Sequence, residues 1–424
     1  MVLASPSVAG RRRVSQSELD MILDAHERYV GGRPNGKRAM LRFIDFTGLR
    51  FEGRNLAGAD LSASIFTGCR MAGAKLDRAN LLGADLRQAD LRSASLTRAD
   101  LRGATLRGAN LTAADLTDAD VREGQVPVPA MRSGLASRKT TQQVGVLDQA
   151  VFCGATLDGS RLDGVSARAA DFTDCSLKGA NLSGANFKDA VLTGAILDGA
   201  EVAGANLENT SFRDSVLTGC DMDRARTAGA DFQGALREPT TDAVAKAPGL
   251  MDAIMAHEAW RKSGGRQGAP ARLAGEDLRP LGDQLKGVRL TAADLRGACL
   301  VGLDLAEAEL QGANLERADL RGTNLKCADL RGSRLASANL TKADLRSAQL
   351  GGLPLGPSRV TPVTLASSRL RYVQGQGADL TDAVLDGADL RGADFTGAIL
   401  DRVSLEAADT TAALGLGAAK KAVA

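Results

Sequence analysis

The chain has 424 residues, with 48 glycines and only 3% aromatic residues, and its 53 Lys and Arg almost cancel its 51 Asp and Glu. This balance argues against attraction of the whole chain to nucleic acid or to an anionic membrane surface, and no segment approaches the ~18 apolar residues that a membrane span requires. The scarcity of aromatic side chains predicts a core made from one small side chain repeated many times.

Residues 1–14 are expected to form a disordered tail, because no apolar segment follows their charged residues as it would in a signal peptide. The next segment, SQSELDMILDAHERYVGGR, predicts an amphipathic helix that begins at a capping box of Ser15 and Glu18 and ends at Gly31. We interpret this helix as the cap of the structure that follows. Its apolar stripe comprises Leu19, Ile22, Leu23, His26 and Tyr29, and we expect His26 and Tyr29 to be packing residues.

From Leu41 the chain changes to a five-residue period, illustrated by ADLRQADLRSASLTRADLRG at residues 84–103. An apolar residue, called the centre below, occupies every fifth position from Leu41 to Val126, and a small residue usually precedes it by two positions. Two further runs extend from Leu147 to Phe232 and from Leu285 to Leu405. A helix repeats every 3.6 residues and a strand every two, so neither explains a period of five. Internal repetition of this kind is typical of a solenoid.

The phrase A(D/N)LXX, which covers about 300 of the 424 residues, resembles the pentapeptide repeat family. The resemblance implies an all-β solenoid, a right-handed quadrilateral β-helix in which four phrases form one coil of 20 residues. It also implies that each centre and the small residue two positions before it point inward. The sequence supports a 20-residue coil independently, because large apolar residues recur at that spacing in the series Phe152, Phe172, Leu192, Phe212 and Phe232.

The first break, residues 127–146, contains no centres, no acidic residue and three basic residues, Arg132, Arg138 and Lys139. Two arrangements are open: a loop that protrudes from one corner of the coil, or a linker between two separate stacks. The loop is favoured, since the run that follows has no helix of its own to cover its leading coil. The three basic residues are candidate contacts for a partner.

The second break, residues 237–272, is expected to hold a linker and a second cap helix, PGLMDAIMAHEAWRKSGGR, with Pro248 at the helix start. His257 and Trp260 take the places of His26 and Tyr29, and each histidine lies in the tripeptide AHE. Packing is the favoured role for both histidines. Contact with a partner and a metal or catalytic role are the alternatives, and the HExxH zinc motif is absent.

The chain therefore reads as two copies of one plan, a cap helix followed by a β-helix. The first copy is predicted at residues 15–236 and the second β-helix at residues 273–410, with a polar tail at 411–424.

The third run keeps its five-residue frame through an atypical stretch, GGLPLGPSRVTPVTLASSRLRYVQGQGADL, in which only Gly375 lacks a centre side chain. An irregular surface on a regular rod suggests a contact with a partner, and tolerated insertion or drift is the alternative. The candidate contacts in this stretch lie around Pro354, Pro357, Pro362, Arg369, Arg371 and Tyr372.

The outward positions carry no recognisable catalytic pattern. Asp before the centre and Arg after it predict a ladder of surface ion pairs, each contributing little; examples are Asp85/Arg87, Asp90/Arg92, Asp100/Arg102, Asp319/Arg321 and Asp329/Arg331. The six cysteines have no metal spacing and are expected to be buried filler in a reducing cytoplasm. We therefore expect no enzymatic activity, no cofactor and no metal.

The favoured function is a protein-interaction or scaffold module in the bacterial cytoplasm, with an unidentified protein partner and no direct contact with nucleic acid. The resemblance supplies an alternative, because some pentapeptide repeat proteins mimic duplex DNA and bind DNA gyrase, inhibiting it or protecting it from quinolones. Such mimicry needs an acidic rod. Only residues 147–236 are acidic, with a net charge of −6, whereas residues 41–126 carry +1 and residues 285–410 carry −1.

Overall fold

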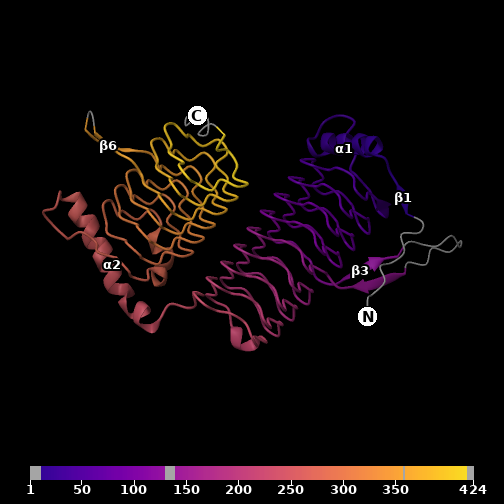
Figure 1. Cartoon of the computed structure of the whole chain (residues 1–424), viewed down its shortest axis with the longest axis horizontal. Coiled ribbons are helices and arrows are strands. Elements are labelled where there is room, and N and C mark those ends of the chain that lie inside the picture. The colour runs from indigo at the N-terminus through magenta and orange to yellow at the C-terminus, as the bar shows by residue number, and fades with distance from the viewer. Residues whose placement is uncertain (1–10, 129–138, 357–358, 418–424) are drawn as a thin grey trace. The chain divides into compact units, whose positions relative to one another are not determined.

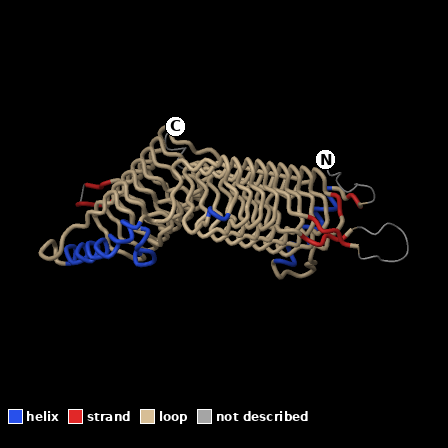
Figure 2. Tube along the Cα trace, turned by 90° about the horizontal axis from the view of Figure 1, so that it is seen from below, coloured by secondary structure: helices blue, strands red, loops and turns tan. Residues whose placement is uncertain are grey.

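The computed structural model describes residues 11–128, 139–356 and 359–417, and the chain divides into two compact units, Met1–Glu238 and Pro239–Ala424 (Figure 1). Each unit contains a helix and a stack of coils in which long strands are replaced by short turns (Figure 2). Each unit also has a hydrophobic core of its own.

Single parallel bridges hold the coils together, and they recur every five residues. Most bridges join a residue to the one 20 positions later, as in Asn55 with Lys75 and Asp60 with Asn80. The amide of each centre donates to the next coil, for example Leu56 N to Lys75 O at 2.7 Å. Four five-residue sides therefore make one coil, and neighbouring coils satisfy one another's backbone groups.

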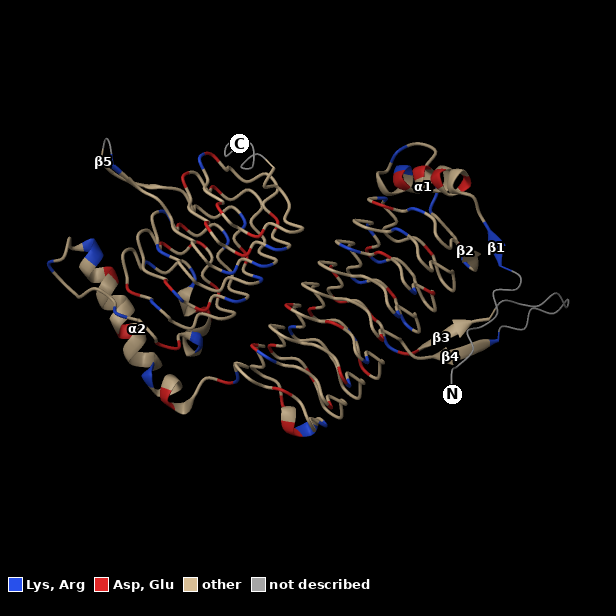
Figure 3. Cartoon of the chain, viewed as in Figure 1, with Lys and Arg blue, Asp and Glu red and all other residues tan. Residues whose placement is uncertain are grey.

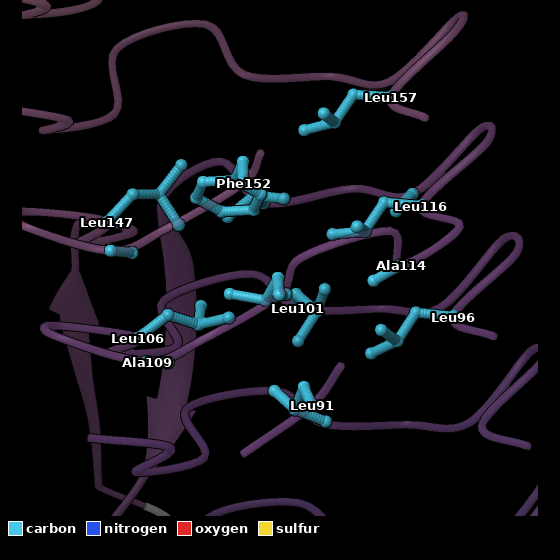
Figure 4. Packing of buried hydrophobic residues seen from close by; sticks show 14 of the residues in the cluster. Leu91, Leu96, Leu101, Leu106, Ala109, Ala114, Leu116, Leu147, Phe152 and Leu157 are labelled. Carbon is cyan, nitrogen blue, oxygen red and sulfur yellow. The ribbon is translucent and has the colours of Figure 1, made fainter. Parts of the chain in front are cut away.

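The centres form the core, and they stack in columns. Figure 4 shows Leu96 and Leu116 on successive coils, both at most 1% exposed. Burying each leucine stabilises the fold by ~1.5–3 kcal/mol before chain entropy is subtracted. The predicted aromatic column is confirmed, since the rings of Phe152 and Phe172 lie 4.6 Å apart and parallel within 1°.

The polar residue before each centre shapes the corner of the coil. Asp85 Oδ1 accepts a hydrogen bond from Arg87 N at 3.2 Å, and Asn55 Oδ1 accepts one from Ala57 N at 3.0 Å. Asp and Asn both form this turn, which explains why the repeat accepts either residue at that position. The sequence predicts only an ionic role for these aspartates, and the structure adds this hydrogen bond to the backbone.

α1 (Gln16–Val30) covers the leading coil of the first unit. Its N-cap is the predicted one, with Ser15 Oγ accepting from Glu18 N at 3.2 Å, and Leu19 and Leu23 are fully buried. The helix ends at Gly31, as predicted.

The expected disordered tail at residues 1–14 is too long. Residues 1–10 lie outside the described part of the chain, but β1 (Arg12–Arg13) pairs in parallel with β2 (Ile44–Asp45). Val14 is buried in the core of the first unit. This apolar contact and the pairing of Arg13 with Asp45, 3.9 Å apart, place the segment on the leading coil.

α2 (Thr241–Lys262) is the corresponding helix of the second unit. The predicted start at Pro248 is wrong, because that proline lies inside the helix. The cap is Thr240, whose hydroxyl accepts from Ala243 N at 3.2 Å, whereas proline has no side-chain acceptor to offer. Two short 3₁₀ helices complete the helical elements, η1 (Met222–Arg224) and η2 (Arg279–Leu285).

In the described part of the chain, two antiparallel hairpins leave the coils. In the first unit β3 (Gly124–Pro127) pairs with β4 (Thr140–Gln143), and in the second β5 (Leu353–Gly356) pairs with β6 (Arg359–Thr361). Three residues counted as centres lie in these hairpins and do not point into a coil, so their assignment was wrong: Val126, Leu355 and Val360.

The coils also continue beyond the predicted end of the repeats at residue 410. Asp394 bridges Leu414, and Leu416 is buried in the core of the second unit. Only the part of the predicted tail at residues 418–424 lies outside the described chain.

Candidate functional site

The break predicted at residues 127–146 corresponds to the first hairpin, and the coil resumes beyond it in register. Thr105 bridges Val146 and Asn110 bridges Val151, so the spacing of 20 residues becomes 41 across the insertion. The break is therefore a hairpin that leaves one coil rather than a linker between separate stacks. Of the predicted contacts, Lys139 is exposed beside β4, while Arg132 and Arg138 lie outside the described residues.

Val126 attaches this hairpin to the outside of the stack. A Cβ built on Gly83 would lie 2.2 Å from a methyl carbon of Val126, and one built on Gly103 would lie 2.9 Å from its other methyl. These two glycines are 20 residues apart and therefore stand on successive coils. Their missing side chains leave the space that the valine fills.

The second hairpin is attached in the same way. Leu353 packs over Gly332: a Cβ built on this glycine would lie 2.6 Å from Leu353 Cβ. Leu353 also lies over Gly312, one coil earlier, where a Cβ would lie 3.9 Å from its Cδ2. Arg334 bridges Thr364, so ten residues are added to the usual spacing before the coil resumes. Because ten is twice five, the insertion is invisible to a five-residue count.

The second hairpin presents apolar side chains to solvent. Leu355 is 55% exposed and Val360 is 51% exposed, and the neighbouring Arg359 is exposed as well. Leu355 lies at a register irregularity between Pro354 and Gly356. This combination of two large apolar residues and one cation was not predicted, because Leu355 and Val360 had been counted as core.

Of the predicted contacts, Pro354 lies in β5 of this hairpin and Pro362 directly follows β6, while Pro357 lies outside the described residues. Arg369, Arg371 and Tyr372 lie on a regular coil. Arg369 is exposed and bridges Asn339. Arg371 Nε donates to Asp389 Oδ2 at 2.5 Å, and Lys342 Nζ lies 5.6 Å from the centre of the Tyr372 ring. Burial favours a higher pKa for the Asp389 carboxyl, but hydrogen bonds from Arg391 and Arg371 hold that pKa well below its ordinary value. Arg371 and Tyr372 thus contribute to the packing of the coil wall.

The histidines of the two cap helices are both buried. His26 Nδ1 accepts a hydrogen bond from Ala39 N at 3.1 Å, and His257 Nδ1 accepts one from Ala271 N at 3.0 Å. Their aromatic neighbours differ in exposure: Tyr29 is half exposed, 6.0 Å from the His26 ring, and Trp260 is partly buried, 5.5 Å from the His257 ring. Within the described residues no group of three His, Cys, Asp or Glu side chains is placed to hold a metal.

The cysteines are unsuited to nucleophilic chemistry where they are buried. Burial raises the pKa of Cys69 and of Cys153 to about 12, so both thiols stay protonated near neutral pH. The expectation that all six are buried filler is wrong for Cys327, which is exposed. That residue occupies the left-handed corner position, with φ 58°, where side chains point to solvent.

Lys and Arg are interspersed with Asp and Glu along the coils of each unit (Figure 3), and the predicted ladder of ion pairs forms between their side chains. All five predicted Asp/Arg pairs form, with nitrogen–oxygen distances of 2.5–2.7 Å. Two exposed carboxylates of the acidic coils at residues 147–236, Asp198 and Glu201, form none of the ion pairs found among the described residues. In the described part of the chain, no helix has the length and apolar character needed to cross a membrane.

The repeats match a known family. The model of the family described as pentapeptide repeats matches residues 44–122, 146–236, 289–352 and 376–409, more than half of the chain. No curated protein sequence matches.

Several solved structures of pentapeptide repeat proteins are similar at low TM-scores. HetL, a protein involved in heterocyst differentiation regulation from the cyanobacterium Nostoc sp. strain PCC 7120, is 25% identical over 76% of this chain and 93% of its own, with a TM-score of 0.32. QnrB1, a plasmid-mediated fluoroquinolone resistance protein, is 20% identical over 49% of this chain and 93% of its own, with a TM-score of 0.24. Rfr23 from the cyanobacterium Cyanothece 51142 is 22% identical over 30% and 64%, with a TM-score of 0.12.

Proposed function

The chain belongs to the pentapeptide repeat family, and we propose that it is a non-enzymatic protein-interaction module whose partner binds the β5–β6 hairpin. The family is generally structural or interaction-forming, and its repeats imply a right-handed β-helix, here of quadrilateral coils with two short cap helices. The observation that carries the proposal is that Leu355 and Val360 are exposed on a segment that the coils do not need.

The coils close without the hairpin. Leu350 is followed by Gly351 and Gly352, and the next coil begins at Val363, which is fully buried. Removing residues 353–362 would therefore restore the 20-residue spacing with a centre at every fifth position. The segment is not needed for the register of the coils, yet it exposes two large apolar side chains. We therefore infer that it has a role outside the coil, in binding.

The shape of the hairpin fits a contact with another protein. A two-stranded hairpin is marginally stable alone, and here the seat of Leu353 over two glycines holds its base. The hairpin exposes Leu355, Val360 and Arg359, which are two large apolar side chains and one cation. Apolar residues gathered on one projecting element are typical of interaction sites, whereas single exposed ones are not informative.

The test compares equally exposed apolar residues on the hairpin and on a coil. The double variant Leu355→Lys/Val360→Lys and the control variant Ile399→Lys, whose wild-type isoleucine is 50% exposed on a coil, are used as baits in the native host with chemical cross-linking. We expect proteins cross-linked to the wild-type chain to be lost with the hairpin variant and retained with the control. Equal recovery with both variants would contradict the proposal.

A second candidate function is DNA mimicry toward DNA gyrase, which the acidic coils of residues 147–236 favour, with their net charge of −6. The exposed carboxylates Asp198 and Glu201 are the residues to change, because they form none of the observed ion pairs. If the wild-type chain inhibits gyrase supercoiling and the variant Asp198→Asn/Glu201→Gln does so less, mimicry replaces the hairpin as the leading function.

We further infer that the chain works in a bacterial cytoplasm and consists of two copies of one plan. None of the six cysteines forms a disulfide, as expected in a reducing compartment, and the AHE tripeptide recurs with the same hydrogen bond in both cap helices. Fractionation of the native host would test the location.

A further inference from the structure

The chain has only two histidines, and both make the same contact. His26 on α1 accepts a hydrogen bond from the amide of Ala39, and His257 on α2 accepts one from the amide of Ala271. Ala39 and Ala271 each lie two residues before the first centre of their unit, Leu41 and Leu273, and both alanines are buried. The histidine is therefore the link between each cap helix and the first coil that it covers.

The direction of this bond fixes the protonation of both rings. A backbone N–H can only donate, so Nδ1 must carry no proton. In the second unit the other nitrogen, Nε2, lies 3.0 Å from the Thr291 carbonyl and therefore carries the proton that it donates there. A ring held on both sides in this way cannot rotate to offer a different nitrogen to Ala271.

On balance, the charged groups around the two rings favour the neutral histidine. Beside His26, the Glu27 carboxylate is already bound by Arg54 Nε at 2.8 Å and by Asn55 N at 3.0 Å, and Arg38 is also near. Around His257, the Glu258 carboxylate is paired with Lys262 at 2.7 Å and with Arg289 at 3.0 Å, while Arg261 is the charged neighbour that acts on the ring.

The pKa values of both imidazoles are lowered accordingly. Burial is the main cause for each, reinforced by Arg38 at His26 and by Arg261 at His257. Some neighbours raise the pKa without reversing the shift. At His26 these are the carbonyls of Ala57 and Leu56 and the Glu27 carboxylate, and at His257 it is the Thr291 carbonyl. The folded protein therefore favours the neutral ring.

The two helices close the ends of the stacks. Leu19 and Leu23 of α1 belong to the core of the first unit, and Ile254 of α2 belongs to the core of the second. The leading coil of a solenoid has no preceding coil to cover its centres, so the cap helix takes that role. Detaching the helix would expose both apolar centres and an unpaired strand edge.

We propose that the two histidines form acid-sensitive clamps: protonation at Nδ1 places a donor against the amide of Ala39 or Ala271 and releases each cap helix from its leading coil. A buried charge without a partner and two opposed N–H donors are both costly, and opening the helix relieves them together. The clamp is independent of the partner-binding hairpin.

The sign of the pH dependence follows from the lowered pKa values. The neutral ring is favoured in the closed state, so the clamp contributes fully above the ~6.5 of an unperturbed histidine. As the pH falls from there toward the lowered pKa, opening becomes about tenfold more frequent per pH unit at each helix. Below the lowered pKa no further loss comes from the histidine.

Amide hydrogen exchange of the full chain tests the clamps directly. Protection of the amides of Ala39 and Ala271, corrected for intrinsic exchange, is compared at about pH 7.5 and about pH 5.5, on either side of the unperturbed histidine value. We expect both amides to lose protection by about tenfold at the lower pH while amides of central coils, such as those of Leu96 and Leu116, do not. Unchanged protection at both alanines would overturn the proposal.

A matched variant distinguishes the effect of histidine protonation from the effect of carboxylate protonation. His26→Asn supplies an uncharged oxygen near the position of Nδ1, so Ala39 should keep its protection at the lower pH while Ala271, still bound to His257, loses it. The reciprocal variant, His257→Asn, should reverse the pattern. If the substituted site loses protection with pH as the wild type does, carboxylates and not histidines cause the opening, and the proposal fails.

A measurement on the wild-type chain guards against variants that do not fold. Only two histidines are present, so two imidazole resonances can be followed by NMR during a pH titration. Both midpoints should lie below ~6.5. A midpoint at or above that value in the folded protein would contradict the clamp.

Discussion

Leu345 and Leu355 are ten residues apart, yet the first is fully buried in a coil of the second unit while the second is 55% exposed on the β5–β6 hairpin. Both follow the same five-residue count. Their environments differ because the residue before each leucine pairs differently. Asp344, before Leu345, bridges residues of the two neighbouring coils, whereas Pro354, before Leu355, pairs with Val360 inside the hairpin. The comparison teaches that the period specifies the coils but not the segments inserted between them.

The largest expected effect is a difference in stability between alanine variants of these two leucines. Leu345→Ala removes buried methyl groups from a stacked column and should lower the free energy of unfolding of the second unit by about 2–5 kcal/mol. Leu355→Ala should change it by less than about 0.5 kcal/mol, as at other surface sites. Urea unfolding followed by fluorescence of Trp260, the chain's single tryptophan and a residue of α2, reports on this unit. Equal losses for the two variants would show that Leu355 belongs to the core.

A smaller effect is expected at the seat of the hairpin. Gly332 and Gly297 both have a left-handed backbone, with φ 65° and 63°, so alanine at either position costs about 1–2 kcal/mol in strain. Only Gly332→Ala also places a Cβ 2.6 Å from Leu353 Cβ, whereas the space around Gly297 is open. We expect faster hydrogen exchange in β5 and β6 for Gly332→Ala and not for Gly297→Ala. Unchanged exchange in both variants would show that the glycine seat does not hold the hairpin.

The smallest effect concerns the corners of the coils. Asp344 Oδ1 accepts from Arg346 N at 3.0 Å, and its other oxygen pairs with the Arg346 guanidinium at 2.5 Å. Asp344→Ala loses both contacts and should cost about 0.5–1.5 kcal/mol, while Asp344→Asn keeps the backbone bond and should cost less. Urea unfolding at low and high salt measures both. If the two variants lose the same amount at all salt concentrations, the backbone bond contributes nothing.

The same carboxylate predicts a second acid step, distinct from the histidine clamps. Burial favours a higher pKa for Asp344, but hydrogen bonds from Arg346 outweigh it and lower the pKa. Its contribution to stability is therefore present above the ~3.9 of an unperturbed aspartate and is lost as the pH falls through the lowered value. In Asp344→Asn, the acid unfolding of the second unit should lose part of this step and keep the step near neutral pH.

The sequence was sufficient for the coils and for the first cap helix. The five-residue period, the phenylalanines 20 residues apart and the Ser15 capping box each have one physical explanation, and each is present in the structure. The second helix was predicted, but its start was not. Proline is a frequent first helical residue, so Pro248 was taken as the start, and the true cap is Thr240, eight residues earlier.

The first hairpin was predicted as a protruding loop, but the second could not be predicted from the same pattern. An insertion of ten residues preserves the count, so Leu355 and Val360 resembled centres, and the glycines that seat the hairpins resemble the many corner glycines with open space around them. The predicted contacts Arg371 and Tyr372 are close to the irregular stretch in sequence. In the structure they contact Asp389 and Lys342 on the wall of a regular coil.

The most direct test of the account is deletion of residues 353–362, which joins Gly352 to Val363 and restores the regular spacing. Partner recovery by cross-linking and urea unfolding followed by Trp260 are measured on the same preparation. The account predicts an unchanged unfolding midpoint together with loss of the partners recovered by the full chain. Unfolding of the second unit, or full recovery of partners by the shortened chain, would contradict it.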